Sequence, residues 1–197
     1  MWPEQKFIEV MSLAQHYGLP TQLLDWSYDY KVALYFSLKD IVTECKNSDG
    51  ILWAFNYKIY EKYSNKESPY FNQLRFYRPE YNRNPYLKAQ KGLFTYIIDN
   101  PTNQSKKELN ERIIDEIKNK TNPKDRWGCG SKIPKITTFD IKDDEILFYR
   151  IKIPKNKKPQ FLKELYADGY SEEYLFPDYK GAILAMENKI KLENLLK

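Results

Sequence analysis

Apolar side chains near the start of the chain recur at the spacing of an α-helix. They lie three or four positions apart, which predicts an amphipathic helix with one face in the core. These side chains belong to Phe7, Val10, Met11 and Ala14. Gly18 and Pro20 follow soon after, so we expect the helix to end near residues 16–17.

A second helix is predicted around residues 32–36, which are apolar on nearly every face and therefore typical of a buried helix. Ser27 or Asp29 stands before this run as a candidate N-cap, because a short polar side chain accepts hydrogen bonds from the first turn. Thr21 is a further capping candidate, for a short turn through residues 22–24.

Four shorter apolar runs predict strands. Residues 51–55 and 92–98 read as buried strands. Residues 136–141 and 146–153 flank the polar turn 142–145, a pattern that favours a β-hairpin.

The remaining segments are assigned by composition and period. Residues 61–86 are rich in Tyr, Asn and Pro without a clear period, so we expect a long loop with short pieces of structure, of the kind that is often functional. Helices are predicted over residues 106–120, 159–167 and 180–196. Because strands alternate irregularly with helices, we predict an α+β fold: a single compact domain with a mixed or antiparallel sheet flanked by helices.

Composition narrows the class of protein. Of 197 residues, 32 are Lys or Arg and 27 are Asp or Glu, which leaves a net charge of +5, too small for a strong field. No apolar run approaches the roughly 20 residues that a membrane-spanning helix needs. No signal peptide is recognised, and the widely separated Cys45 and Cys129 fit no metal site. We therefore expect a cytoplasmic protein with reduced cysteines, no metal and no membrane contact; a disulfide in a secreted protein is the alternative.

His16 is the single histidine and the first candidate for proton transfer, because an imidazole titrates near neutral pH. Its predicted place at a helix C-terminus favours the cationic form. The alternative is a helix-end histidine that hydrogen-bonds the last carbonyl groups.

Asp25 lies between the apolar residues Leu24 and Trp26 and is costly to bury without a hydrogen-bond donor. It is predicted either to cap the following helix or to orient a polar group, such as His16 or a ligand hydroxyl.

Gln90 is the third candidate, since it stands just before an apolar strand whose first residue, Gly92, indicates close approach of backbone or ligand. Its amide suits a ligand amide or ribose, and equally the backbone of a loop. The guanidinium groups that offer phosphate-binding forks nearby, or form a solvated loop, belong to Arg75, Arg78 and Arg83.

Residues 14–27, AQHYGLPTQLLDWS, resemble the signature of the FRG domain family. The usual form in that family reads HYGLPTRLLDWT and continues into a helix of the VALYFA type, as residues 32–37, VALYFS, do here. Residues 84–95 and 151–181 resemble two later parts of the family in the same order. The resemblance covers about residues 10–190.

Three features depart from the family pattern. The chain contains no Phe-Arg-Gly or Tyr-Arg-Gly motif, and Gln22 and Tyr86 stand where the family usually has arginine. We therefore expect residues 1–197 to form one FRG-like domain that lacks its N-terminal strand. The two missing cations weaken the case for an anion-binding role.

The missing motif is similar to the arginine motif with which ADP-ribosyltransferases hold NAD. The resemblance thus implies a nucleotide-binding or ADP-ribosyltransferase-like effector of a bacterial toxin or phage-defence system, with NAD as the substrate and no other cofactor. His16 would polarise the substrate, Asp25 would orient it, and Gln90 would bind its ribose or amide. Further ligand contacts are expected from Tyr17, Thr21, Gln22, Trp26 and Arg83.

The alternative is a non-catalytic module, or a degenerate remnant of such a domain. Its tyrosine-rich stretch, residues 57–86, would then contact a protein or a single-stranded nucleic acid. Tyrosine rings interleaved with arginines suit single strands, on which bases stack.

Overall fold

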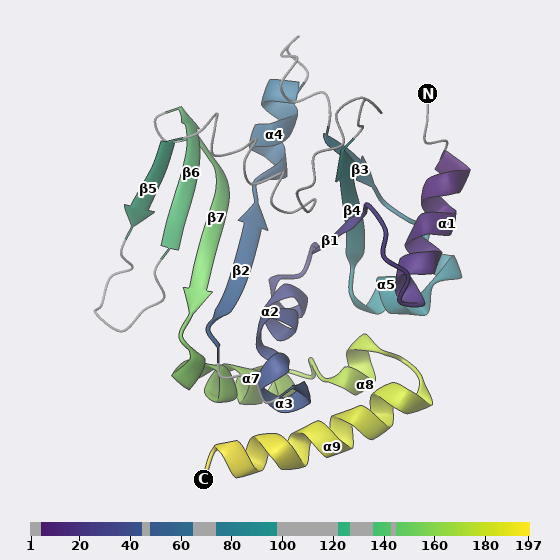
Figure 1. The fold of residues 1–197 in the computed structure, drawn as a ribbon, viewed down its shortest axis with the longest axis vertical. Helices are drawn as coiled ribbons and strands as arrows, with labels where there is room; N and C mark the ends of the chain where they lie inside the picture. Colours follow the sequence, from purple (N-terminus) through teal and green to yellow (C-terminus); the bar gives the residue numbers. More distant parts are fainter. Residues whose placement is uncertain (1–4, 45–47, 65–73, 98–121, 127–135, 143–144) are drawn as a thin grey trace.

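The computed structural model describes residues 5–44, 48–64, 74–97, 122–126, 136–142 and 145–197 (Figure 1). These residues form helices and two antiparallel sheets, so the predicted α+β class is confirmed. The helix predicted over residues 106–120 lies outside the described residues. Within the described residues, no helix is both long and apolar enough to cross a membrane.

The first sheet has three strands, in the order β1 (Leu24–Ser27), β4 (Gly92–Ile97) and β3 (Leu74–Tyr77). Strand β4 lies in the centre, with Leu24 opposite Thr95 on one side and Tyr77 opposite Phe94 on the other. This register brings the segment after His16 against the segment after Gln90, although they are far apart in the sequence.

The second sheet has four strands, in the order β2 (Gly50–Phe55), β7 (Glu145–Ile153), β6 (Ile136–Lys142) and β5 (Asn122–Arg126). Strands β6 and β7 form the predicted hairpin. Strand β5 was not predicted, because its sequence NPKDR has low β-propensity. It pairs with β6 at the edge of the sheet, where a proline is tolerated.

Helices cover the ends and flanks of the sheets. In Figure 1, α1 and α5 lie beside the first sheet, and α7, α8 and α9 lie together at one end of the molecule. The helices are α1 (Gln5–His16), α2 (Tyr30–Leu38), α3 (Asp40–Thr43), α4 (Tyr57–Ser64), η1 (Tyr81–Arg83), α5 (Pro85–Ala89), η2 (Lys155–Lys157), α7 (Lys158–Ala167), α8 (Glu172–Leu175) and α9 (Tyr179–Leu195).

Helix α1 ends at His16 as predicted, but only part of the predicted face is turned inward. Phe7 and Val10 are exposed, whereas Ile8 is buried with Met11 packed close by. The sequence of α1 carries apolar residues on two faces, and only contacts with the first sheet decide which face is inward.

Within the described part of residues 61–86, the short pieces of structure expected in the predicted long loop are the end of α4, β3, η1 and the start of α5. The Asn84 side chain accepts hydrogen bonds from the backbone amides of Tyr86 and Leu87, which caps α5. Tyr60 and Tyr77 are buried, whereas Tyr57 is 47% exposed, so only some tyrosines of the described stretch are available for stacking.

An aromatic cluster joins the two sheets. Phe55 of β2 stacks on Phe148 of β7 at 4.5 Å between ring centroids, and on Phe76 of β3 at 5.5 Å. Trp26 of β1 lies 5.7 Å from Phe55. Because the rings come from both sheets, the packing fixes how the sheets meet, and the candidate site lies beside this contact.

Candidate functional site

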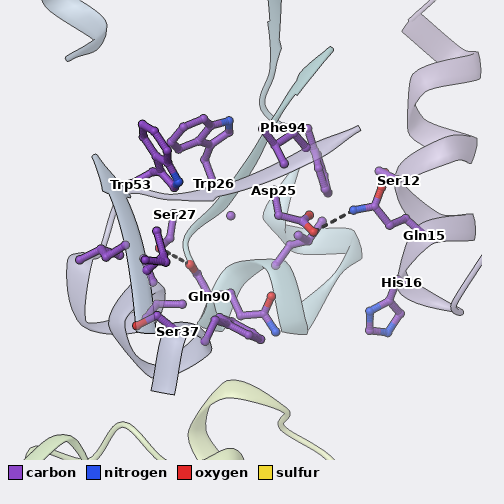
Figure 2. A pocket seen from close by; sticks show the side chains of 18 of the residues that line it. Ser12, Gln15, His16, Asp25, Trp26, Ser27, Ser37, Trp53, Gln90 and Phe94 are labelled. Carbon is purple, nitrogen blue, oxygen red and sulfur yellow. Dashed lines mark hydrogen bonds between the residues drawn. The ribbon is translucent and has the colours of Figure 1, made fainter. Parts of the chain in front are cut away.

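A cavity of about 630 Å³ lies between the two sheets, next to α1, α2 and α5. Figure 2 shows both indoles at one end, His16 at the other, and Asp25 between them. Its lining residues are Ser12, Gln15, His16, Leu24, Asp25, Trp26, Ser27, Val32, Ala33, Phe36, Ser37, Ile51, Leu52, Trp53, Leu87, Gln90, Gly92, Phe94, Phe148 and Phe176.

Two tryptophans form the aromatic end of the cavity. Trp26 donates a hydrogen bond from Nε1 to Thr95 Oγ1 at 2.9 Å, which fixes the orientation of its indole. Trp53, from β2, lies 6.5 Å from Phe148, and the guanidinium of Arg150 lies 5.9 Å from the Trp53 ring centroid. Such rings provide flat apolar surface and retain a polar edge.

Asp25 is the carboxylate of the cavity wall. Gln15 donates from Nε2 to Asp25 Oδ2 at 2.8 Å, and the Thr21 hydroxyl donates to Gln15 Oε1. Solvent reaches Asp25, yet the surrounding protein atoms remove part of its hydration. This desolvation raises the pKa of Asp25, and the hydrogen bond from Gln15 offsets part of the rise.

Asp25 neither caps α2 nor pairs with His16. The N-cap of α2 is Asp29, whose side chain accepts from the backbone amide of Lys31. The Asp25 carboxylate is instead held by Gln15, one residue before His16.

His16 is the last residue of α1 and packs against aromatic rings. Its ring centroid lies 4.3 Å from that of Tyr86 and 5.3 Å from that of Tyr17. His16 borders the cavity, and within the described residues its contacts are these rings.

Gln90 connects three elements at the cavity wall. Its side-chain Nε2 donates to the Leu175 carbonyl of α8 at 3.1 Å, and its backbone carbonyl accepts from the Ser27 hydroxyl of β1 at 2.7 Å. It also ends α5 as its C-cap residue. The amide that was predicted to bind a ligand is therefore already engaged with the backbone, as the structural alternative proposed.

The three predicted catalytic residues thus line one cavity, whereas the predicted ligand contacts are divided. Trp26 lines the cavity, but Tyr17, Thr21 and Gln22 do not. Arg83 belongs to η1, and its side chain lies outside the described part of the structure.

Sequence reasoning missed several lining residues, notably Gln15 and Trp53. Gln15 lies inside the quoted run of residues 14–27, and its position one residue before His16 was the only available indication. Trp53 was assigned to a buried strand, because nothing local shows that β2 faces β1 across a cavity.

The electrostatics of the wall are simple. No Lys or Arg is among the lining residues of the described chain, and Asp25 is the only carboxylate there. In the same described residues, no group of three or more His, Cys, Asp and Glu side chains is placed to hold a metal ion.

Part of the sequence that lines the cavity matches a known protein family. The family model of the FRG domain matches residues 2–46. Residues 2–46 are therefore similar to the FRG domain, and we call them the FRG segment. Figure 1 places this segment from α1 through β1 and α2 to α3, and it supplies more than half of the residues that line the cavity. No curated protein and no solved structure matches the chain.

Proposed function

We propose that this chain binds a nucleotide such as NAD through its base, in the cavity beside the FRG segment. The observation that carries the proposal is the presence of two indoles and the Asp25–Gln15 pair in one cavity of about 630 Å³. Ligand cavities are commonly roughly 300–1,000 Å³, mostly apolar, with a few placed polar groups.

The chemistry of the wall selects a flat ring that donates hydrogen bonds. Trp26 and Trp53 would contact the faces or edges of an aromatic heterocycle. An ionised Asp25 only accepts hydrogen bonds, so the ligand has to donate. The amino group of adenine and the carboxamide of nicotinamide both do so.

The phosphates of such a ligand would extend out of the cavity. Lining residues in the described chain include no Lys or Arg, and Gln22 and Tyr86 stand where the family usually has arginine. Removing the phosphates should therefore change the affinity little. We expect a nucleoside to bind nearly as tightly as the corresponding nucleotide.

Thermal shift and calorimetry with NAD, ADP-ribose, adenosine and nicotinamide riboside test the proposal. A ligand at 100 times its Kd adds about 2.7 kcal/mol to the free energy of unfolding, and each kcal/mol raises Tm by roughly 2–4 °C at this size. Asp25→Asn should weaken binding roughly tenfold, because a hydrogen bond to a charged group contributes about 1.5–3 kcal/mol.

Glu173→Gln is the matched control, since Glu173 is an exposed carboxylate of α8 that does not line the cavity. Its binding should equal that of the unaltered chain. The proposal fails if none of these compounds raises Tm at millimolar concentration, or if Asp25→Asn binds as the unaltered chain does.

The contacts favour binding over catalysis, because Asp25 is held by Gln15 and the Gln90 amide is bound to a backbone carbonyl. Chromatography of NAD incubated with the chain separates the two functions. Binding without release of nicotinamide assigns a binding module. If the chain releases nicotinamide from NAD, and His16→Ala abolishes this release but still binds NAD, the transferase-like alternative is assigned.

A further inference from the structure

Helix α9 has a buried face and, opposite it, an exposed row of apolar side chains. Figure 1 shows it at the edge of the molecule, with α3, α7 and α8 on one side of it. The face toward these helices contains Gly181, Asn188 and Leu192, all of them buried. An amphipathic surface helix usually turns its polar side to solvent, whereas α9 turns large apolar side chains outward.

The solvent side bears a row of large apolar side chains, which we call the α9 stripe. It consists of Tyr179, Ile183, Met186 and Ile190, with exposed fractions of 92%, 58%, 71% and 63%. The spacings of four, three and four residues align the side chains in one row, as in the seam of a coiled coil. A contiguous exposed row of this kind marks an interaction surface.

We propose that the α9 stripe is the contact between two copies of this chain, whose α9 helices pair antiparallel about a two-fold axis between Leu184 and Ala185. In this arrangement Tyr179 packs beside the partner's Ile190, and Ile183 packs beside the partner's Met186. A two-fold contact of this type is self-complementary and closes after two copies.

Charge complementarity favours a second copy of the chain whose α9 runs antiparallel to the first. Lys180 and Glu187 are both exposed and lie seven residues apart, so they flank the stripe on the same side of α9. Antiparallel pairing places Lys180 beside the partner's Glu187, and by symmetry Glu187 beside the partner's Lys180. Parallel pairing would instead give Glu187 the partner's Ala182 as its neighbour and form no such ion pair.

The size of the stripe sets the expected affinity. Four side chains per copy are far fewer than the roughly 20–30 residues per side of a standard interface. We therefore expect a dimer with a Kd on the order of 10–100 μM, in rapid exchange with the monomer. This inference does not depend on the cavity or its ligand.

Sedimentation velocity of the whole chain from about 1 to 300 μM tests the proposal, a range that brackets the expected Kd. The unaltered chain should shift from monomer to dimer, and Ile183→Glu with Met186→Glu should remain monomeric. Lys180→Glu and Glu187→Lys should each raise Kd severalfold, because like charges then face each other. The double variant should return Kd to its original value.

Val10→Glu is the matched control, because Val10 on α1 is as exposed as Ile190, at 63%. It should dimerise as the unaltered chain does. The proposal is overturned if the unaltered chain stays monomeric, which leaves the stripe to another partner. It is also overturned if dimers persist in the α9 variant, or if the charge exchange fails to restore pairing. Circular dichroism verifies that each variant is folded.

Discussion

Glu172 is a carboxylate with 1% of its surface exposed, so protein donors have to replace its hydration. The Tyr166 hydroxyl donates to its two oxygens at 2.9 and 2.7 Å, and Asn188 Nδ2 donates at 2.7 Å. Burial, together with the charge and hydrogen bonding of Glu172, raises the pKa of Tyr166 and of Tyr35. Both phenols therefore remain protonated and available as donors.

Replacing Glu172 with alanine should lower the free energy of unfolding by about 3 kcal/mol, because buried donors of Tyr166 and Asn188 lose their acceptor. Urea unfolding with an unchanged m-value measures the loss. Glu173→Ala, at the exposed neighbouring position, should change stability by less than about 0.5 kcal/mol. Equal effects of the two substitutions would contradict the role assigned to the buried network.

At the scale of elements, Asp29 holds three segments together. Its side chain accepts from the backbone amide of Lys31 at the start of α2, from Lys91 Nζ at 2.8 Å before β4, and from the Tyr170 hydroxyl at 2.8 Å after α7. Burial raises the pKa of Asp29, but the hydrogen bonds from Lys91, Tyr170 and Lys31 outweigh it, so the pKa is lowered.

A pKa lowered by folding means that Asp29 stabilises the fold above its unfolded pKa of about 3.9, and that this contribution is lost as the pH falls through the folded pKa. Asp29→Ala should cost about 2 kcal/mol at pH 7, as loss of an N-cap does. The difference from the unaltered chain should shrink in denaturant titrations as the pH falls below the unfolded pKa and through the folded one.

Asp168→Ala serves as the control, because Asp168 pairs with the neighbouring Lys31 at the surface. An exposed ion pair contributes about 0–1 kcal/mol, so this variant should be less affected at every pH. A constant difference between Asp29→Ala and the unaltered chain from pH 7 to pH 2 would contradict the assigned charge interaction.

The whole molecule depends on the aromatic contact between its sheets. Phe148 is 3% exposed and lies within 6.5 Å of the ring centroids of Trp26, Trp53 and Phe55. Neither sheet can lose this contact without exposing the rings of the other. We therefore predict one cooperative unfolding transition, with tryptophan fluorescence and far-ultraviolet circular dichroism changing together.

Phe148→Ala should lower the free energy of unfolding by about 3–5 kcal/mol, since a buried phenylalanine leaves a cavity behind. Both optical probes should shift by the same amount in urea. Separate transitions in the unaltered chain would show that the two sheets unfold independently. That result would also contradict the single domain predicted for residues 1–197.

Much of the fold and part of the site were predictable from local patterns. Patterns of apolar residues indicated α2, α7 and the β6–β7 hairpin, because these sequences are continuous apolar runs or place apolar residues at regular positions, and the last helix, α9, was predicted as well. Prediction failed at α5, whose Asn-Pro start is a capping signal that was not used, and at β5, whose strand state depends on pairing with β6.

The sequence by itself placed His16, Asp25 and Trp26 in one short stretch of chain, since a tight turn separates α1 from β1. The similarity to the FRG domain was also visible in the sequence, because the motif consists of consecutive residues. Only the tertiary structure decided that Gln15 holds Asp25, that Trp53 faces the same cavity, and that Trp26 bonds to Thr95, 69 positions away. The physical reason is the sequence separation of the contacts. Local hydrogen bonding and periodicity depend on neighbouring residues, whereas the wall of a cavity depends on how the two sheets pack.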